Sequence, residues 1–123
     1  KIAPNYSEAF LGKAKAFAKL KDYKSAEENF EKSFLVSRNK KERVIFAKGN
    51  FEISRGKFLK ARKDFRTARE INKNFGDAWL AEADVLVKLE KTKEAIALLK
   101  QYLKLRPEDN KASAMVLKLS QGL

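Results

Sequence analysis

Cysteine and histidine are both absent from this sequence of 123 residues. Without cysteine there is no disulfide, thiolate metal site or cysteine nucleophile, and without histidine most zinc chemistry and the usual general base near neutral pH are missing. No apolar run approaches the roughly 18 residues that a membrane span needs, the first residues are not a signal peptide, and the chain does not begin with Met. We expect no cofactor or metal, and a soluble fragment or mature form located in the cytoplasm or the periplasm.

Glycine and proline are scarce, with five and two residues. Ala, Leu, Lys, Glu and Arg dominate nearly every window and strand signals are missing, which predicts an all-helical protein of one domain. The turn SRGKF lacks the second Gly and the GK[ST] ending of a phosphate-binding loop, and the acids are scattered as on solvated helix faces. We therefore expect no enzyme. The abundance of Lys, Phe and Asn favours an AT-rich bacterial source.

Three segments of the chain align with one another at periods of 35 and then 34 residues. Within each segment, residues at offsets 0, 4 and 7 form one stripe of a helix, which predicts its core face. The three stripes are Ala26, Phe30 and Ser33; Ala61, Phe65 and Ala68; and Ala95, Leu99 and Tyr102. Ten residues after each alanine, Val36, Ile71 and Leu105 are expected to close the helix with an apolar contact. Upstream, the small residues Ala14, Gly49 and Ala83 are expected to let paired helices approach closely.

This pattern resembles the tetratricopeptide repeat, a 34-residue helix–turn–helix unit with an early aromatic and a small residue in its first helix and Ala, Phe and Ala in its second. The resemblance implies a right-handed α-solenoid with repeats at 7–40, 41–75 and 76–109, a capping helix at 110–123, and residues 1–6 as the tail of a preceding repeat. The sequence departs from the family at Glu52, where Tyr is usual, and in SRNKKERV, which carries one extra residue.

In this family the first helices line a concave groove through their second, fifth, ninth and twelfth positions. The resemblance implies a partner-binding groove made by Leu11, Lys15, Arg43, Phe46, Asn50, Ile53, Asp77, Leu80, Asp84 and Val87. An apolar floor with a few polar groups suits a peptide or helix of a partner protein. The alternative is that these residues pack against the chain's own cap or a neighbouring repeat.

One subclass of the family binds the C-terminal carboxylate of chaperones through Lys, Asn and Arg. The corresponding positions here hold Leu11, Lys15, Ala47, Asp77 and Ala81. Since only one cation remains, recognition of chaperone tails in that manner is disfavoured.

Positive charge dominates the composition, with 28 Lys or Arg against 16 Asp or Glu, a net charge of +12 and a pI near 9.9. Eleven basic and four acidic residues fall within 41–75, the middle repeat. Its second helix carries a flank that is either a solvated outer wall or a contact for a polyanion. That flank consists of Arg62, Arg66, Arg69 and Lys73. We thus expect a non-enzymatic module with a protein or peptide partner and possible self-association, with nucleic acid or an anionic membrane as the alternative and without a small-molecule substrate.

Overall fold

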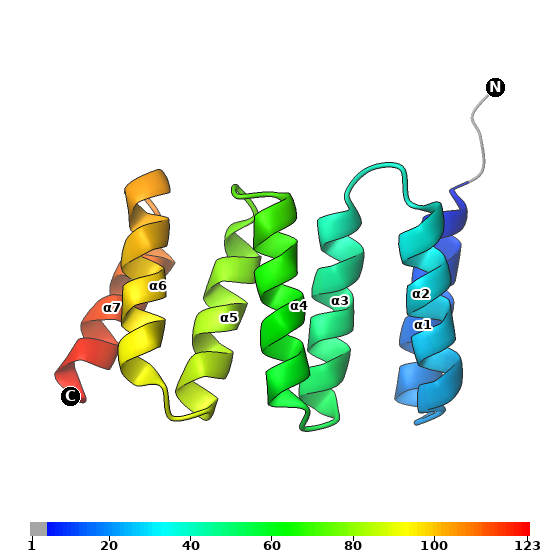
Figure 1. Cartoon of the computed structure of the whole chain (residues 1–123), viewed down its shortest axis with the longest axis horizontal. Helices are drawn as coiled ribbons and strands as arrows, with labels where there is room; N and C mark the ends of the chain where they lie inside the picture. Colours follow the sequence, from blue (N-terminus) through cyan, green and yellow to red (C-terminus); the bar gives the residue numbers. More distant parts are fainter. Residues whose placement is uncertain (1–4) are drawn as a thin grey trace.

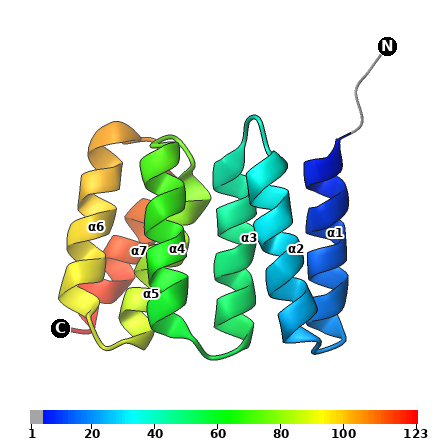
Figure 2. The same cartoon turned by 45° about the vertical axis from the view of Figure 1, so that its right-hand side comes forward.

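The computed structural model describes residues 5–123, which fold into a row of antiparallel helices (Figure 1). In chain order these helices are α1 (Tyr6–Lys19), α2 (Tyr23–Val36), α3 (Lys41–Ser54), α4 (Phe58–Ile71), α5 (Gly76–Lys88), α6 (Thr92–Leu105) and α7 (Asn110–Gln121). No strand occurs in this part of the chain. Each helix packs chiefly against its neighbours in the sequence, so the fold is an all-α helical repeat solenoid. Its elongated form is also visible in Figure 2, where the row is turned by 45°.

Helix starts in the first and last parts of the row follow from capping side chains. Asn5 accepts a hydrogen bond from the Glu8 amide at the start of α1, and Asp22 does the same for Ser25 at the start of α2. Asp109 caps α7 by accepting from the Ala112 amide. The expected tail of a preceding repeat, residues 1–6, falls mainly outside the described residues, although Tyr6 is already the first residue of α1.

The turns inside the three helix pairs share one backbone conformation. Lys21, Gly56 and Glu90 occupy equivalent positions and have φ angles of 61°, 73° and 62°. In each turn the following amide donates to a carbonyl five residues earlier, as from Lys57 to Glu52 at 2.9 Å. This is the bond that closes a helix through a left-handed residue, and it fixes the sharp reversal between paired helices.

The predicted core stripes are buried. All nine residues of the three stripes are at most 3% exposed, and the core alanines at their head are fully covered. The first two clusters also include a residue from the next helix pair: Phe51 joins Ala26 and Phe30, while Val85 joins Ala61 and Phe65. The repeats are therefore joined through shared cores.

One expectation about the ends of the second helices is wrong. Val36, Ile71 and Leu105 are 44%, 47% and 48% exposed, so they do not close these helices with a buried contact. Each is the last residue of its helix, at the edge of the row, where the chain leaves the helix for a connection.

Candidate functional site: a groove between α1 and α3

A cavity of about 540 Å³ lies between α1, α3 and the start of α5. Six of the predicted groove residues line it: Leu11, Lys15, Arg43, Phe46, Asn50 and Asp77. Its wall also includes Ala18, Lys19, Phe30, Ala47, Phe51 and Phe75. The period of the repeat places these side chains together because equivalent positions on successive first helices face the same side of the row.

The other four predicted groove residues lie away from this cavity. Ile53 packs against the core cluster of the middle repeat, and Leu80 and Val87 pack against that of the third. Asp84 is on the exposed side of α5. Partial burial raises the pKa of its carboxyl, an effect that the positive charge of Lys88 reduces.

Aromatic rings make up much of the groove floor. The ring of Phe46 lies 5.3 Å from that of the buried Phe65 and 5.1 Å from that of Phe75, measured between centroids. The Arg43 guanidinium lies 5.6 Å from the centroid of Phe75. Phe46 therefore belongs both to the groove and to the core beneath it, and a charge placed there would damage the fold as well as the groove.

Polar side chains border the aromatic floor and are open to solvent. Lys15, Arg43, Asn50 and Asp77 are all exposed. With Lys19 they place three cations and one carboxylate around the cavity. An apolar floor inside a sparse polar border can take up an apolar side chain and fix the direction of the segment that carries it.

The groove continues toward the other end of these helices. A second cavity, of about 820 Å³, surrounds the start of α1 and the linker between α2 and α3. Leu11 and Arg43 line both cavities, so the hollow follows α1 and α3 along much of their length. The linker contains the extra residue of SRNKKERV, and its Lys40 adopts a left-handed φ of 58°.

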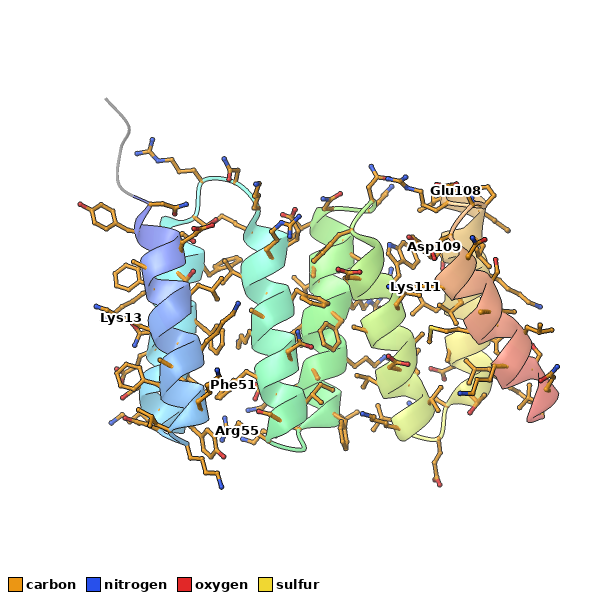
Figure 3. The ribbon with its side chains drawn as sticks, turned by 180° about the vertical axis from the view of Figure 1, so that it is seen from behind. Lys13, Phe51, Arg55, Glu108, Asp109 and Lys111 are labelled. Atoms are coloured by element: carbon orange, nitrogen blue, oxygen red, sulfur yellow. The ribbon has the colours of Figure 1, made fainter. Side chains whose placement is uncertain are left out.

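One residue of this site and one contact beside it were missed by sequence reasoning. Phe75 lies in the connection before α5, outside the periodic positions, although an apolar residue just ahead of a helix is a known signal for packing there. The contact between the first two helix pairs was also missed. The Arg55 guanidinium lies 4.7 Å from the Tyr23 ring centroid and donates a hydrogen bond to Glu27 at 2.8 Å. Figure 3 shows Arg55 beside Phe51, between the first helix pair and α3.

The predicted polyanion residues, three on α4 and Lys73 just after it, separate into two groups. Arg69 donates to the buried carboxylate of Glu82 on α5 at 2.5 Å, and Arg62 lies 3.7 Å from the same carboxylate. Arg66 pairs with Glu70 on the surface at 3.6 Å, and Lys73 is exposed. Two of the four cations are thus engaged in the seam between α4 and α5.

Two family models described as tetratricopeptide repeat match residues 52–119 and residues 7–40. The chain belongs to the tetratricopeptide repeat family. This confirms the resemblance stated on the sequence. No curated protein sequence matches this tetratricopeptide repeat chain.

Solved tetratricopeptide repeat structures share its fold. The TPR domain of Arabidopsis OM64 is 21% identical, with a TM-score of 0.75 over 98% of this chain and 100% of that one. The first TPR of Spaghetti (RPAP3) bound to the HSP90 peptide SRMEEVD is 19% identical, with a TM-score of 0.76 and 98% of both chains covered. The second TPR domain of human RPAP3 in complex with the HSP70 peptide SGPTIEEVD is 18% identical, with a TM-score of 0.72 over 94% of this chain and 95% of that one. At these identities the likeness establishes the fold.

Proposed function

We propose that this chain is a non-enzymatic interaction module that binds a peptide or helix of a partner protein in the groove between α1 and α3. The cavity between these helices carries the proposal, because its volume of about 540 Å³ and its aromatic floor suit an apolar side chain of a partner. Exposed Lys15 and Asn50 at its border can bind the partner's backbone or polar groups. Support also comes from the two RPAP3 domains, which hold peptides of other proteins.

The chemistry of this groove differs from that of a clamp for a chaperone's terminal carboxylate. Lys15 is the single cation at the five positions that build such a clamp, and Asp77 stands at one of the others. A carboxylate at Asp77 repels a partner's terminal carboxylate. We therefore propose that the partner is held through an apolar anchor, with polar contacts fixing its register.

A selected peptide tests this proposal. The whole chain is used to select binders from a random peptide library, and their affinities are measured by fluorescence anisotropy. We expect Asn50→Arg and Lys15→Glu each to weaken binding by about tenfold or more, because both residues border the groove and hot-spot contacts are worth about 2 kcal/mol. Lys32→Glu makes the same charge change on α2, where Lys32 is exposed away from the groove, and should leave the affinity unchanged. Equal losses of affinity from Lys15→Glu and Lys32→Glu would show that the peptide does not bind in the groove.

Binding of a polyanion through Arg62, Arg66, Arg69 and Lys73 has less support as an alternative. Arg62 and Arg69 are paired with Glu82, whose side chain is 2% exposed, and cations held in this way are not free for phosphate. Only Arg66 and Lys73 of that flank remain exposed.

A further inference from the structure

The turns inside the three helix pairs lie along one edge of the row, the lower edge in Figure 1. We call residues 19–26, 54–61 and 88–95 the hairpin edge. It contains nine Lys or Arg against three Asp or Glu. The opposite edge, over the equal lengths 36–43, 71–78 and 105–112, contains seven against four. The hairpin edge therefore carries more net positive charge than the opposite edge, and every repeat contributes to it.

The cations of the hairpin edge are mostly lysines without an acidic partner. All salt bridges found within residues 5–123 are made by arginines. The eight lysines of the edge take part in none of them, and all but the half-buried Lys57 are exposed. These lysines are Lys19, Lys21, Lys24, Lys57, Lys60, Lys88, Lys91 and Lys93. Apart from Lys60 and Lys88, whose charges act on Asp64 and Asp84, these lysine charges are available to a ligand outside the molecule.

Several of these lysines stand where they oppose the helix dipole. Lys24, Lys60 and Lys93 lie in the first turns of α2, α4 and α6, and Lys57 and Lys91 precede α4 and α6 without a side-chain capping bond. A cation near a helix N-terminus is unfavourable because the first amides already carry positive partial charge. Folding does not account for lysines at these positions in all three repeats, which favours a role in binding.

Two leucines project among the lysines. Leu20 is 76% exposed and Leu59 is 68% exposed, the highest values among the large apolar side chains of residues 5–123. Leu20 directly follows α1 as its C-cap and Leu59 lies in the first turn of α4, so both are next to the turn of their helix pair. Exposed leucines beside exposed lysines combine an apolar group for acyl chains with charge for headgroups.

We propose that the hairpin edge docks on the surface of an anionic membrane, with its lysines at the headgroups and Leu20 and Leu59 inserted between them. A bilayer surface fits better than a nucleic acid for two reasons. Single-strand binders add exposed aromatic rings for base stacking, whereas Tyr23 and Phe58 at this edge are partly buried in the core clusters. Exposed leucines gain from acyl chains but have no counterpart in a phosphate backbone. This surface is separate from the proposed peptide groove.

Vesicle binding tests the proposal with the whole chain. Sedimentation is measured with vesicles of phosphatidylcholine and phosphatidylserine, and with phosphatidylcholine alone. We expect binding only to the anionic vesicles, and its loss when salt is raised to about 1 M, where the Debye length falls to about 3 Å. Replacing Lys24, Lys60 and Lys93 with Ala should weaken binding by about 100-fold, since each lysine near the surface contributes about a fivefold factor.

Matched variants separate local contact from total charge. Replacing Lys32, Lys100 and Lys104 with Ala removes the same charge from other parts of α2 and α6 and should change binding much less. Leu20→Ser with Leu59→Ser should weaken binding by about tenfold at constant charge. Equal losses from the two lysine triples, or no effect of the leucine pair, would overturn the proposal. So would binding of an RNA or DNA oligonucleotide that depends on the same lysines while anionic vesicles are not bound.

Discussion

At the scale of single residues, the distance between α3 and α4 depends on Gly49. A Cβ atom at this position would lie 2.6 Å from Cε1 of Phe65, a ring that is 1% exposed. The equivalent positions in the other repeats hold alanine, and Ala14 and Ala83 are fully buried. The middle repeat thus needs glycine where the other repeats accept a methyl group. Its two helices, α3 and α4, pack around Phe65, and the ring of Phe65 is also in contact with that of Phe46.

Gly49→Ala is expected to destabilise the protein by up to about 2 kcal/mol. Overpacking against Phe65 costs about 1 to 3 kcal/mol and outweighs the gain in helix propensity of about 1 kcal/mol. Gly12→Ala is the control, because nothing lies within 4 Å of the added Cβ on α1. That variant should be more stable by about 0.5 to 1 kcal/mol. Urea denaturation measures both, and a gain for both variants would contradict the close packing at Gly49.

Asp64 on α4 is a half-buried acid whose Oδ2 atom is buried without a hydrogen-bond partner. The pKa of Asp64 is raised to about 6, chiefly by burial; Lys48, Lys63 and Lys60 oppose the rise and Glu52 adds to it. Because the folded pKa exceeds the unfolded value of about 3.9, the contribution of Asp64 to stability is fully present below pH 4 and is lost as the pH rises through 6.

We expect Asp64→Asn to be more stable than the parent chain at pH 7, by about 2 kcal/mol. The advantage should decline on acidification and vanish only below about pH 3, where the aspartate is protonated in both the folded and the unfolded state. Denaturation curves at several pH values between 4 and 7 measure this difference. An advantage that stays constant or grows toward acid pH would disprove the raised pKa.

At the scale of helices, the starts of the three second helices differ in their caps. Asp22 caps α2, whereas Lys57 and Lys91 occupy the same position before α4 and α6 and make no side-chain capping bond. The seams between pairs differ as well. Arg55 joins α3 to α2, while Arg69 joins α4 to Glu82 on α5 and lies 4.7 Å from the Trp79 ring centroid.

Lys57→Asp should stabilise the chain by about 1 kcal/mol, because an aspartate before α4 can accept from its free amides and favours the helix dipole. Lys100→Asp makes the same charge change in the middle of α6 and should bring no gain. Thermal unfolding compares the two variants. If Lys57→Asp were no more stable than Lys100→Asp, the lysine before α4 would not be unfavourable for folding.

Arg69→Ala should destabilise the protein by about 3 to 5 kcal/mol, because it leaves the buried Glu82 carboxylate with only the more distant Arg62. Arg66→Ala on the same helix removes a surface pair with Glu70 and should change stability by less than about 0.5 kcal/mol. Chemical denaturation of the two variants shows whether cations of α4 stabilise its interface with α5. Similar small losses of stability in both variants would mean that they do not.

At the scale of the whole molecule, the 34-residue period predicted the parts of the fold that repeat. It identified the core alanines, the phenylalanines beneath them and the tight approach at Gly49, because each occupies a position that recurs in every repeat. It could not predict the contacts that Arg55 and Arg69 make between helix pairs, or the position of Phe75. The other repeats have no arginine equivalent to Arg55 or Arg69, and no phenylalanine equivalent to Phe75, to signal these contacts. For the same reason only part of the groove expected from the family lines the cavity, which ends at the start of α5.

Two surfaces of different character result from this arrangement. The groove between α1 and α3 has an aromatic floor and faces a peptide-sized partner in our proposal, whereas the hairpin edge is formed by lysines and two leucines. A chain that uses both could hold a partner protein beside an anionic surface. The groove is the central claim, because the membership of the family and the cavity both support it.

Chemical-shift mapping tests that claim most directly. Amide resonances of the whole chain are recorded while a selected peptide is titrated in. The account predicts that the largest shifts fall on α1, α3 and the start of α5, around Lys15, Asn50 and Phe75, with little change on α2, α4 and α6. Shifts concentrated on the second helices, with Lys15 and Asn50 unaffected at saturation, would contradict it.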